Sequence, residues 1–143
     1  MRALRTIPIY VRFAEAIKLN SPDAWIINYT NPMSLCVKTL YLCGPVQAVV
    51  ETNAVFERDA IRPILAGDLP ECVKELIMPA FENHEAILEA ALTCNEELVV
   101  KAFMNDPQVK GRKCKEQDIR LLVKDMLDGT KKYLPEGWSS YKR

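Results

Sequence analysis

Apolar residues in the first third of the chain change spacing from one segment to the next. Over residues 5–19 they recur at i, i+3, i+4 and i+7, which predicts an amphipathic helix with Pro8 in its first turn. Residues 24–29 are short, mostly apolar and rich in β-branched and aromatic side chains, as in a buried parallel strand. Helical spacing returns over 33–42, and the β-branched run 46–53 predicts a second strand. The stripe of the first helix consists of Tyr10, Phe13, Ala14 and Ile17.

The remainder of the chain is patterned as helices almost to its end. Asn95 is a predicted N-cap, with the carboxylates of Glu96 and Glu97 at the positive end of the following helix. Residues 138–143 are predicted to form a polar tail with little to bury. The pattern therefore predicts an α/β piece, as in a doubly wound sheet, followed by a mainly helical piece. The helical segments are expected near 70–78, 81–92, 95–104 and 115–134.

Composition limits the classes of function. With 143 residues, 49% hydrophobic, the chain can build one modest core. Nineteen basic residues balance nineteen acidic ones, so no overall field attracts nucleic acid or an anionic membrane. No apolar run approaches the roughly 20 residues that span a bilayer, and the first residues lack the features of a secretory signal. We therefore expect a cytoplasmic protein with neither nucleic-acid nor membrane partners.

Metal-ligating residues are sparse. Five cysteines lie at wide, uneven intervals without a C-x-x-C pair, and His84 is the one histidine. Flanked by Glu82 and Glu85, His84 is interpreted as a partly exposed histidine in preference to a ligand. We assign neither a catalytic residue nor a metal ligand. The cysteines are Cys36, Cys43, Cys72, Cys94 and Cys114.

The strongest local signal for ligand binding is Asn31-Pro32, directly after the first predicted strand. Ligands of α/β sheets gather at the carboxyl ends of strands. The Asn31 side chain carries a donor and an acceptor, which suits a sugar hydroxyl or a nicotinamide ribose. The alternative is simple turn chemistry, because Asn-Pro is a common loop dipeptide.

A second polar cluster follows the second predicted strand. Arg58 or Arg62 is a candidate to bind a ligand carboxylate, such as that of a uronate, because a guanidinium donates two parallel hydrogen bonds to a carboxylate. The alternative is an exposed network of ion pairs with Glu57 and Asp59.

Several stretches in collinear order resemble the NAD- and manganese-dependent glycosidases of glycoside hydrolase family 4. The order and spacing match over nearly the whole chain, so accidental similarity is improbable. The stretches are Leu4-Arg5-Thr6-Ile7-Pro8, residues 21–33, Val50-Glu51-Thr52-Asn53, residues 66–70, residues 89–93 and residues 102–107.

The resemblance implies a fold, a reaction and site residues. It implies that 1–45 is the remnant of a Rossmann-like (lactate/malate dehydrogenase-like) cofactor domain and 46–143 that of the family's C-terminal domain. In the family, NAD transiently oxidises the sugar at C3, a metal polarises the carbonyl, and elimination expels the aglycone, unlike the two-carboxylate mechanism of most glycosidases. By the Asn-Pro match, Asn31 is the expected substrate contact and Asn28 a weaker candidate near the cofactor. Tyr29-Thr30 and Val50-Glu51-Thr52-Asn53 resemble the branch of the family that acts on α-galactosides or α-galacturonides more than the branch that acts on phosphorylated sugars.

Departures from the family pattern indicate an incomplete enzyme. The chain has no G-x-G-x-x-G turn for the NAD pyrophosphate, which predicts truncation at the N-terminus. In the family, a segment with the Cys and His manganese ligands and the base tyrosine lies between two elements that residues 38–45 join directly here. The resemblance therefore predicts an internal deletion. No metal role is carried onto Cys43, and Tyr41 and Tyr133 are expected to pack on apolar helix stripes. NAD and Mn²⁺ are thus implied by the resemblance, while we expect the isolated chain to be inactive.

Two other functions stay open. The chain is alternatively a non-catalytic remnant that acts as a packing or subunit-contact module, or an unrelated small α/β binding domain with a pocket at Asn31. A sheet that lacks its first strands exposes an edge and an apolar face. We therefore expect association, as a homo-oligomer or with a complementary fragment, besides the sugar substrate.

Overall fold

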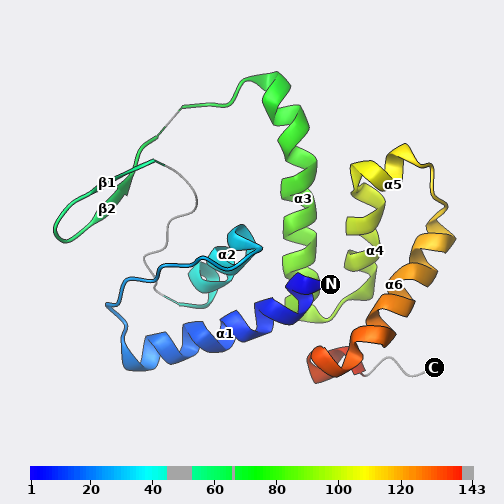
Figure 1. Cartoon of the computed structure of the whole chain (residues 1–143), viewed down its shortest axis with the longest axis horizontal. Helices are drawn as coiled ribbons and strands as arrows, with labels where there is room; N and C mark the ends of the chain where they lie inside the picture. The colour runs from blue at the N-terminus through cyan, green and yellow to red at the C-terminus, as the bar shows by residue number, and fades with distance from the viewer. Residues whose placement is uncertain (45–52, 66, 140–143) are drawn as a thin grey trace.

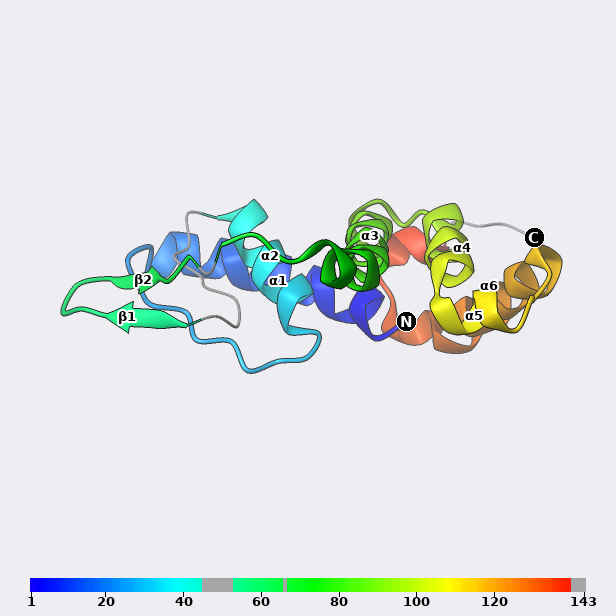
Figure 2. The ribbon, with the colours of Figure 1, turned by 90° about the horizontal axis from the view of Figure 1, so that it is seen from above.

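The computed structural model describes residues 1–44, 53–65 and 67–139, and these residues are mostly helical (Figure 1). Helices α1 and α2 and a small hairpin lie toward one end of the molecule, and α4, α5 and α6 lie toward the other (Figure 2). The elements are α1 Arg2–Asn20, α2 Met33–Cys43, β1 Ala54–Phe56, β2 Ile61–Pro63, α3 Glu71–Thr93, α4 Glu96–Asn105, α5 Pro107–Gly111 and α6 Glu116–Thr130, followed by the 3-10 helices η1 Lys131–Tyr133 and η2 Glu136–Ser139.

The strand predicted over 24–29 is wrong. This segment runs between α1 and α2 without regular secondary structure, because a strand requires a neighbour and none of the described residues pairs with it. The strand predicted over 46–53 lies almost wholly outside the described residues.

The sheet of the described residues is instead a two-stranded antiparallel hairpin of β1 and β2. Val55 lies opposite Arg62, and Phe56 lies opposite Ile61. Its strands are three residues long and mostly exposed, so the alternating pattern that marks a longer, half-buried strand is missing.

Helix α1 confirms the first predicted helix, with a shifted apolar stripe. It begins at Arg2, so Pro8 lies inside the helix and not in its first turn as predicted. Phe13, predicted on the buried stripe, is half exposed and makes an edge-on contact with the Tyr10 ring at 5.6 Å between centroids. The buried stripe consists of Ala3, Leu4, Ile7, Tyr10 and Ala14.

Helix α3 is one continuous helix where the sequence predicts two. It passes through Pro79, which has no N–H to donate to the preceding turn. Its buried residues, Ala86, Leu88, Ala90 and Ala91, all lie after that position, so packing holds the second half in place. The helix ends at Cys94, which adopts a left-handed conformation with φ of 55°.

Helices α2 and α4 confirm the predicted segments, and Asn95 caps α4 as predicted. Its side-chain oxygen accepts a hydrogen bond from the Glu97 N–H at 2.9 Å. The Glu97 carboxylate also receives two hydrogen bonds from Arg120 of α6, at 2.6 and 2.8 Å.

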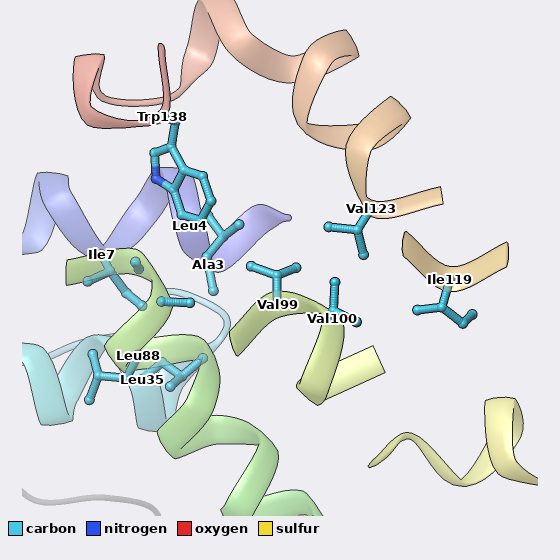
Figure 3. Close-up of a cluster of buried hydrophobic side chains, with 12 residues drawn as sticks. Ala3, Leu4, Ile7, Leu35, Leu88, Val99, Val100, Ile119, Val123 and Trp138 are labelled. Atoms are coloured by element: carbon cyan, nitrogen blue, oxygen red, sulfur yellow. The ribbon is translucent and has the colours of Figure 1, made fainter. Parts of the chain in front are cut away.

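Most of the buried side chains form one cluster, which we call the central cluster (Figure 3). The prediction of a tail with little to bury is wrong for Trp138, which is only 7% exposed and points from η2 toward α1. A tryptophan side chain has a large apolar surface, so its burial is favourable even where its neighbours in the sequence are polar. The members are Ala3, Leu4, Ile7, Leu35, Leu88, Ala90, Ala91, Val99, Val100, Ile119, Val123 and Trp138.

A smaller set, the α1–α2 cluster, lies between the first two helices. It consists of Tyr10, Ala14, Cys36 and Leu40, with Ile17, Ile26 and Cys43 packed against it. The predicted packing of Tyr41 and Tyr133 is wrong: both side chains are more than half exposed. Tyr133 instead lies near the cationic groups of Arg5 and Lys132.

The fold class is therefore mainly helical with a small two-stranded sheet. The predicted helical C-terminal region is confirmed, whereas the described residues do not form a doubly wound or Rossmann-like sheet. In the described part of the chain, none of the helices has the length and apolar character needed to cross a membrane.

Candidate functional site

The candidate site is the segment that leads from α1 into α2 and carries Asn28 and Asn31. Asn28 is half buried and turned toward α1, where its Oδ1 accepts a hydrogen bond from the Tyr10 hydroxyl at 2.6 Å. The same oxygen accepts the Thr30 N–H at 3.1 Å. These two hydrogen bonds hold the backbone just before Asn31, so Asn28 stabilises the conformation of the segment.

The α1–α2 cluster beneath this segment keeps its polar groups uncharged. Burial raises the pKa of the Tyr10 hydroxyl, so it stays protonated and remains a donor to Asn28 at neutral pH. Burial likewise raises the pKa of the Cys36 thiol. Cys36 therefore has neither the exposure nor the thiolate character of a reactive cysteine.

Asn31 lies on the surface immediately before α2. It is exposed, and the Asn31–Pro32 peptide bond is cis. Pro32 occupies the N-cap position of α2 without a side-chain cap, and its carbonyl receives the Cys36 N–H. The first amides of α2, beginning at Met33 two residues after Asn31, have no backbone partner in the described residues. Such amides favour anionic or hydroxyl oxygens.

A polar contact joins the first turn of α2 to α3. Ser34 Oγ and His84 Nδ1 are 3.3 Å apart, and both residues are half buried. One turn further on, Lys38 forms an ion pair with Glu85. His84 is thus partly exposed, as predicted, and fixes α2 against α3.

An apolar groove of about 270 Å³ opens beside the segment. One wall is the outer part of α1, and the other is the segment itself. Its polar side-chain groups are those of Tyr10 and Asn28. The lining residues are Tyr10, Phe13, Ala16, Ile17, Ile26, Ile27, Asn28 and Leu40.

The remaining candidate residues do not converge on Asn31. Cys43 is half buried against the α1–α2 cluster. Arg62 pairs with Glu57 at 3.2 Å on the hairpin, which confirms the interpretation of an exposed ion pair. Among residues 1–44, 53–65 and 67–139, no three His, Cys, Asp or Glu side chains come together as metal ligands.

Sequence reasoning missed two residues that shape the site. Tyr10 carries the hydrogen bond to Asn28, but its place on an apolar stripe indicates only packing. Ser34 contacts His84 from 50 positions away, a separation at which local patterns carry no information.

Comparison with known proteins gives a consistent result. The sequence profile of the family 4 glycosyl hydrolase C-terminal domain matches residues 5–109. An alpha-galacturonidase of Lachnoclostridium phytofermentans is 60% identical over 95 residues, which are 66% of this chain and 20% of that protein. An alpha-galacturonidase of Thermoanaerobacter italicus is 44% identical over 63% of this chain and 19% of its own length. An alpha-galactosidase of Bacillus subtilis is 39% identical over 46% of this chain and 18% of its own length.

The chain spans about a fifth of the length of these relatives. No solved structure matches it. The profile match covers well over half of the 143 residues and includes most of α1, the Asn31 segment, α2, α3 and α4. The chain therefore belongs to the family 4 glycosyl hydrolases.

Proposed function

We propose that this chain supplies the sugar-contacting Asn-Pro segment of a family 4 glycosidase that acts on α-galacturonides. The observation that carries the proposal is the exposed Asn31, two residues before the first α2 amides, which have no backbone partner in the described residues. Together they offer a side-chain donor, a side-chain acceptor and backbone donors to sugar oxygens. A uronate adds a carboxylate, which the positive end of a helix favours over a neutral hydroxymethyl group.

The order of similarity supports the substrate class. Identity falls from 60% to between 42% and 44% among the alpha-galacturonidases, to 39% for the alpha-galactosidase and 29% for a probable 6-phospho-beta-glucosidase of Bacillus subtilis. The pattern favours a uronic acid over a neutral or phosphorylated sugar.

Membership of the family suggests dependence on NAD and a metal for the whole enzyme. The described residues of this chain do not fit either group alone: they hold no cluster of metal ligands, and the sequence has no glycine-rich turn for a pyrophosphate. We therefore derive no catalytic step through NAD or Mn²⁺. Asn28 is bound to Tyr10 and Thr30, so we assign it to positioning the segment, with its cofactor role as a weaker proposal.

The test is a titration of the ¹⁵N-labelled chain with galacturonate, followed by amide NMR. We expect shifts of the Asn31 side-chain amide and of the backbone amides of residues 33–35, and smaller shifts with galactose. Asn31→Ala should abolish them, whereas Asn20→Ala, an exposed asparagine at the end of α1, should not. Absence of shifts at these positions would refute the proposed contact.

The proposed inactivity of the isolated chain has its own test. With an aryl α-galacturonide, NAD and Mn²⁺, we expect no release of the aryl group above a reaction without protein. Measurable turnover that is lost in Asn31→Ala would contradict incompleteness while supporting the site.

A second candidate function is a subunit-contact module. The specific observation is that Trp25, Ile27 and Tyr29 expose 44%, 77% and 88% of their surface on one segment. Large apolar side chains gathered in this way mark interaction surfaces.

A further inference from the structure

Residues 24–30 are extended and have unpaired backbone groups. The Ala24 N–H bonds back to Ser21, and the Thr30 N–H is taken by Asn28 Oδ1. Between them, residues 25–29 form no backbone hydrogen bond with any described residue. In Figure 1 the segment is the blue trace that returns from the end of α1 to the start of α2. A short extended segment of this kind is a template for pairing with another strand.

The side chains of the segment alternate between two faces. Ile26 packs against the α1–α2 cluster, and Asn28 bonds Tyr10 of α1. The large apolar side chains of Trp25, Ile27 and Tyr29, at the odd positions between and beside them, are exposed. This two-residue period is that of a β-strand with one covered and one open face.

We propose that this segment pairs with the same segment of a second copy of the chain, as two antiparallel strands centred on Ile27. In this register Ile27 faces Ile27, and Trp25 faces Tyr29 of the other copy on the same face of the ribbon. Cross-strand pairs of aromatic and β-branched residues stabilise antiparallel strands by about 0.2–1 kcal/mol each.

Charge and surface area favour a second copy as the partner. Residues 24–30 carry no charged side chain, so two copies meet without repulsion. Phe13, half exposed on the adjoining groove, adds to the three outer side chains. Together these four offer on the order of 500 Å² of apolar surface per copy. Burial of this whole surface on two copies would remove roughly 1,000 Å², the lower limit for a specific interface, so pairing that covers part of it gives a weak interface.

Pairing covers only part of this apolar surface. The association is therefore weak, and the fraction of paired chains rises with protein concentration. The outer face of the ribbon stays apolar, and two ribbons packed face to face give a tetramer at higher concentration. The inference deepens the proposed association of the chain and does not depend on sugar binding. A chain that binds galacturonate as a monomer would overturn this inference alone.

The experiment combines sedimentation velocity with hydrogen exchange over a wide range of protein concentration. We expect dimers, or dimers and tetramers, and slower exchange of the amides of residues 25–29 as concentration rises. Ile27→Lys and Tyr29→Lys, both at exposed positions, should weaken association at least about tenfold. Leu76→Lys, at a leucine of α3 that is 81% exposed, is the matched control and should leave it unchanged.

Each other outcome overturns the proposal. A monomer at all concentrations, or an oligomer that survives both lysine variants, would show that this surface does not pair. Protection of residues 25–29 that is independent of concentration would mean that the segment is paired within its own chain. Protection that appears only on adding a longer family 4 chain would identify that chain as the occupant instead.

Discussion

Replacing Tyr10 by phenylalanine tests whether α1 holds the candidate site in shape. The change removes the hydroxyl that donates to Asn28 Oδ1 at 2.6 Å and keeps the ring in the α1–α2 cluster. A net hydrogen bond of this kind contributes about 0.5–1.5 kcal/mol to the free energy of unfolding. Asn28 Oδ1 keeps its bond from the Thr30 N–H, so no acceptor is left bare and the loss should be about 0.5–1 kcal/mol.

Urea denaturation followed by circular dichroism measures this loss. Tyr133→Phe is the matched control, because its side chain is 53% exposed, and it should change stability by less than about 0.5 kcal/mol. In a double-mutant cycle with Asn28→Ala, we expect a coupling energy of about 0.5–1 kcal/mol between the two residues. Tyr10→Phe with unchanged stability and no coupling to Asn28 would refute the hydrogen bond and the positioning role built on it.

Two further predictions concern the helical part of the chain. A Cβ on Gly137 would lie 2.6 Å from Cys94 Sγ, so Gly137→Ala should lower the free energy of unfolding by about 1–3 kcal/mol. Gly129→Ala, at a helical glycine with nothing within 4 Å, should raise it by up to about 0.5 kcal/mol, and equal effects in thermal melts would contradict the contact. The hydrogen bonds from Arg120 lower the pKa of Glu97, so the pair stabilises the fold above the unfolded value near 4.5 and loses this effect as pH falls through the lowered value. Glu97→Gln should therefore lower the melting temperature slightly at pH 7 and match the parent in strong acid, and a difference that persists there would count against the pair.

The helices were predictable because their signals are local. The i, i+3, i+4 spacing and the Asn95 cap each need only one turn of sequence, and α1, α2 and α4 follow them. The segment 24–29 has the composition of a strand, but whether a strand forms depends on a partner far along the chain or outside it. The burial of Trp138 has the same origin, because it depends on α1 and α3 and not on its own polar neighbours.

The candidate site was predictable only in part, for a related reason. Asn31 stands out because Asn-Pro follows an apolar run, a feature within a few residues. Its supports come from elsewhere: Tyr10 lies 18 positions before Asn28, and His84 lies 50 positions after Ser34. The resemblance to family 4 identified the Asn31 segment because it rests on local sequence motifs. It gave no information on the contacts of Tyr10 and His84, which join residues far apart in the sequence.

Helix α1 connects the candidate site to the rest of the molecule. Its first two turns give Leu4 and Ile7 to the central cluster, and the turns that follow give Tyr10 and Ala14 to the α1–α2 cluster. The boundary predicted near residue 45 stays a prediction, and residues on both sides of it share the central cluster through this helix. A change in Tyr10 should therefore alter the Asn31 segment first, because the core formed by α3, α4 and α6 retains its own contacts. The segment that faces sugar or a second copy is thus held by the part of α1 farther from the central cluster, where local opening costs least.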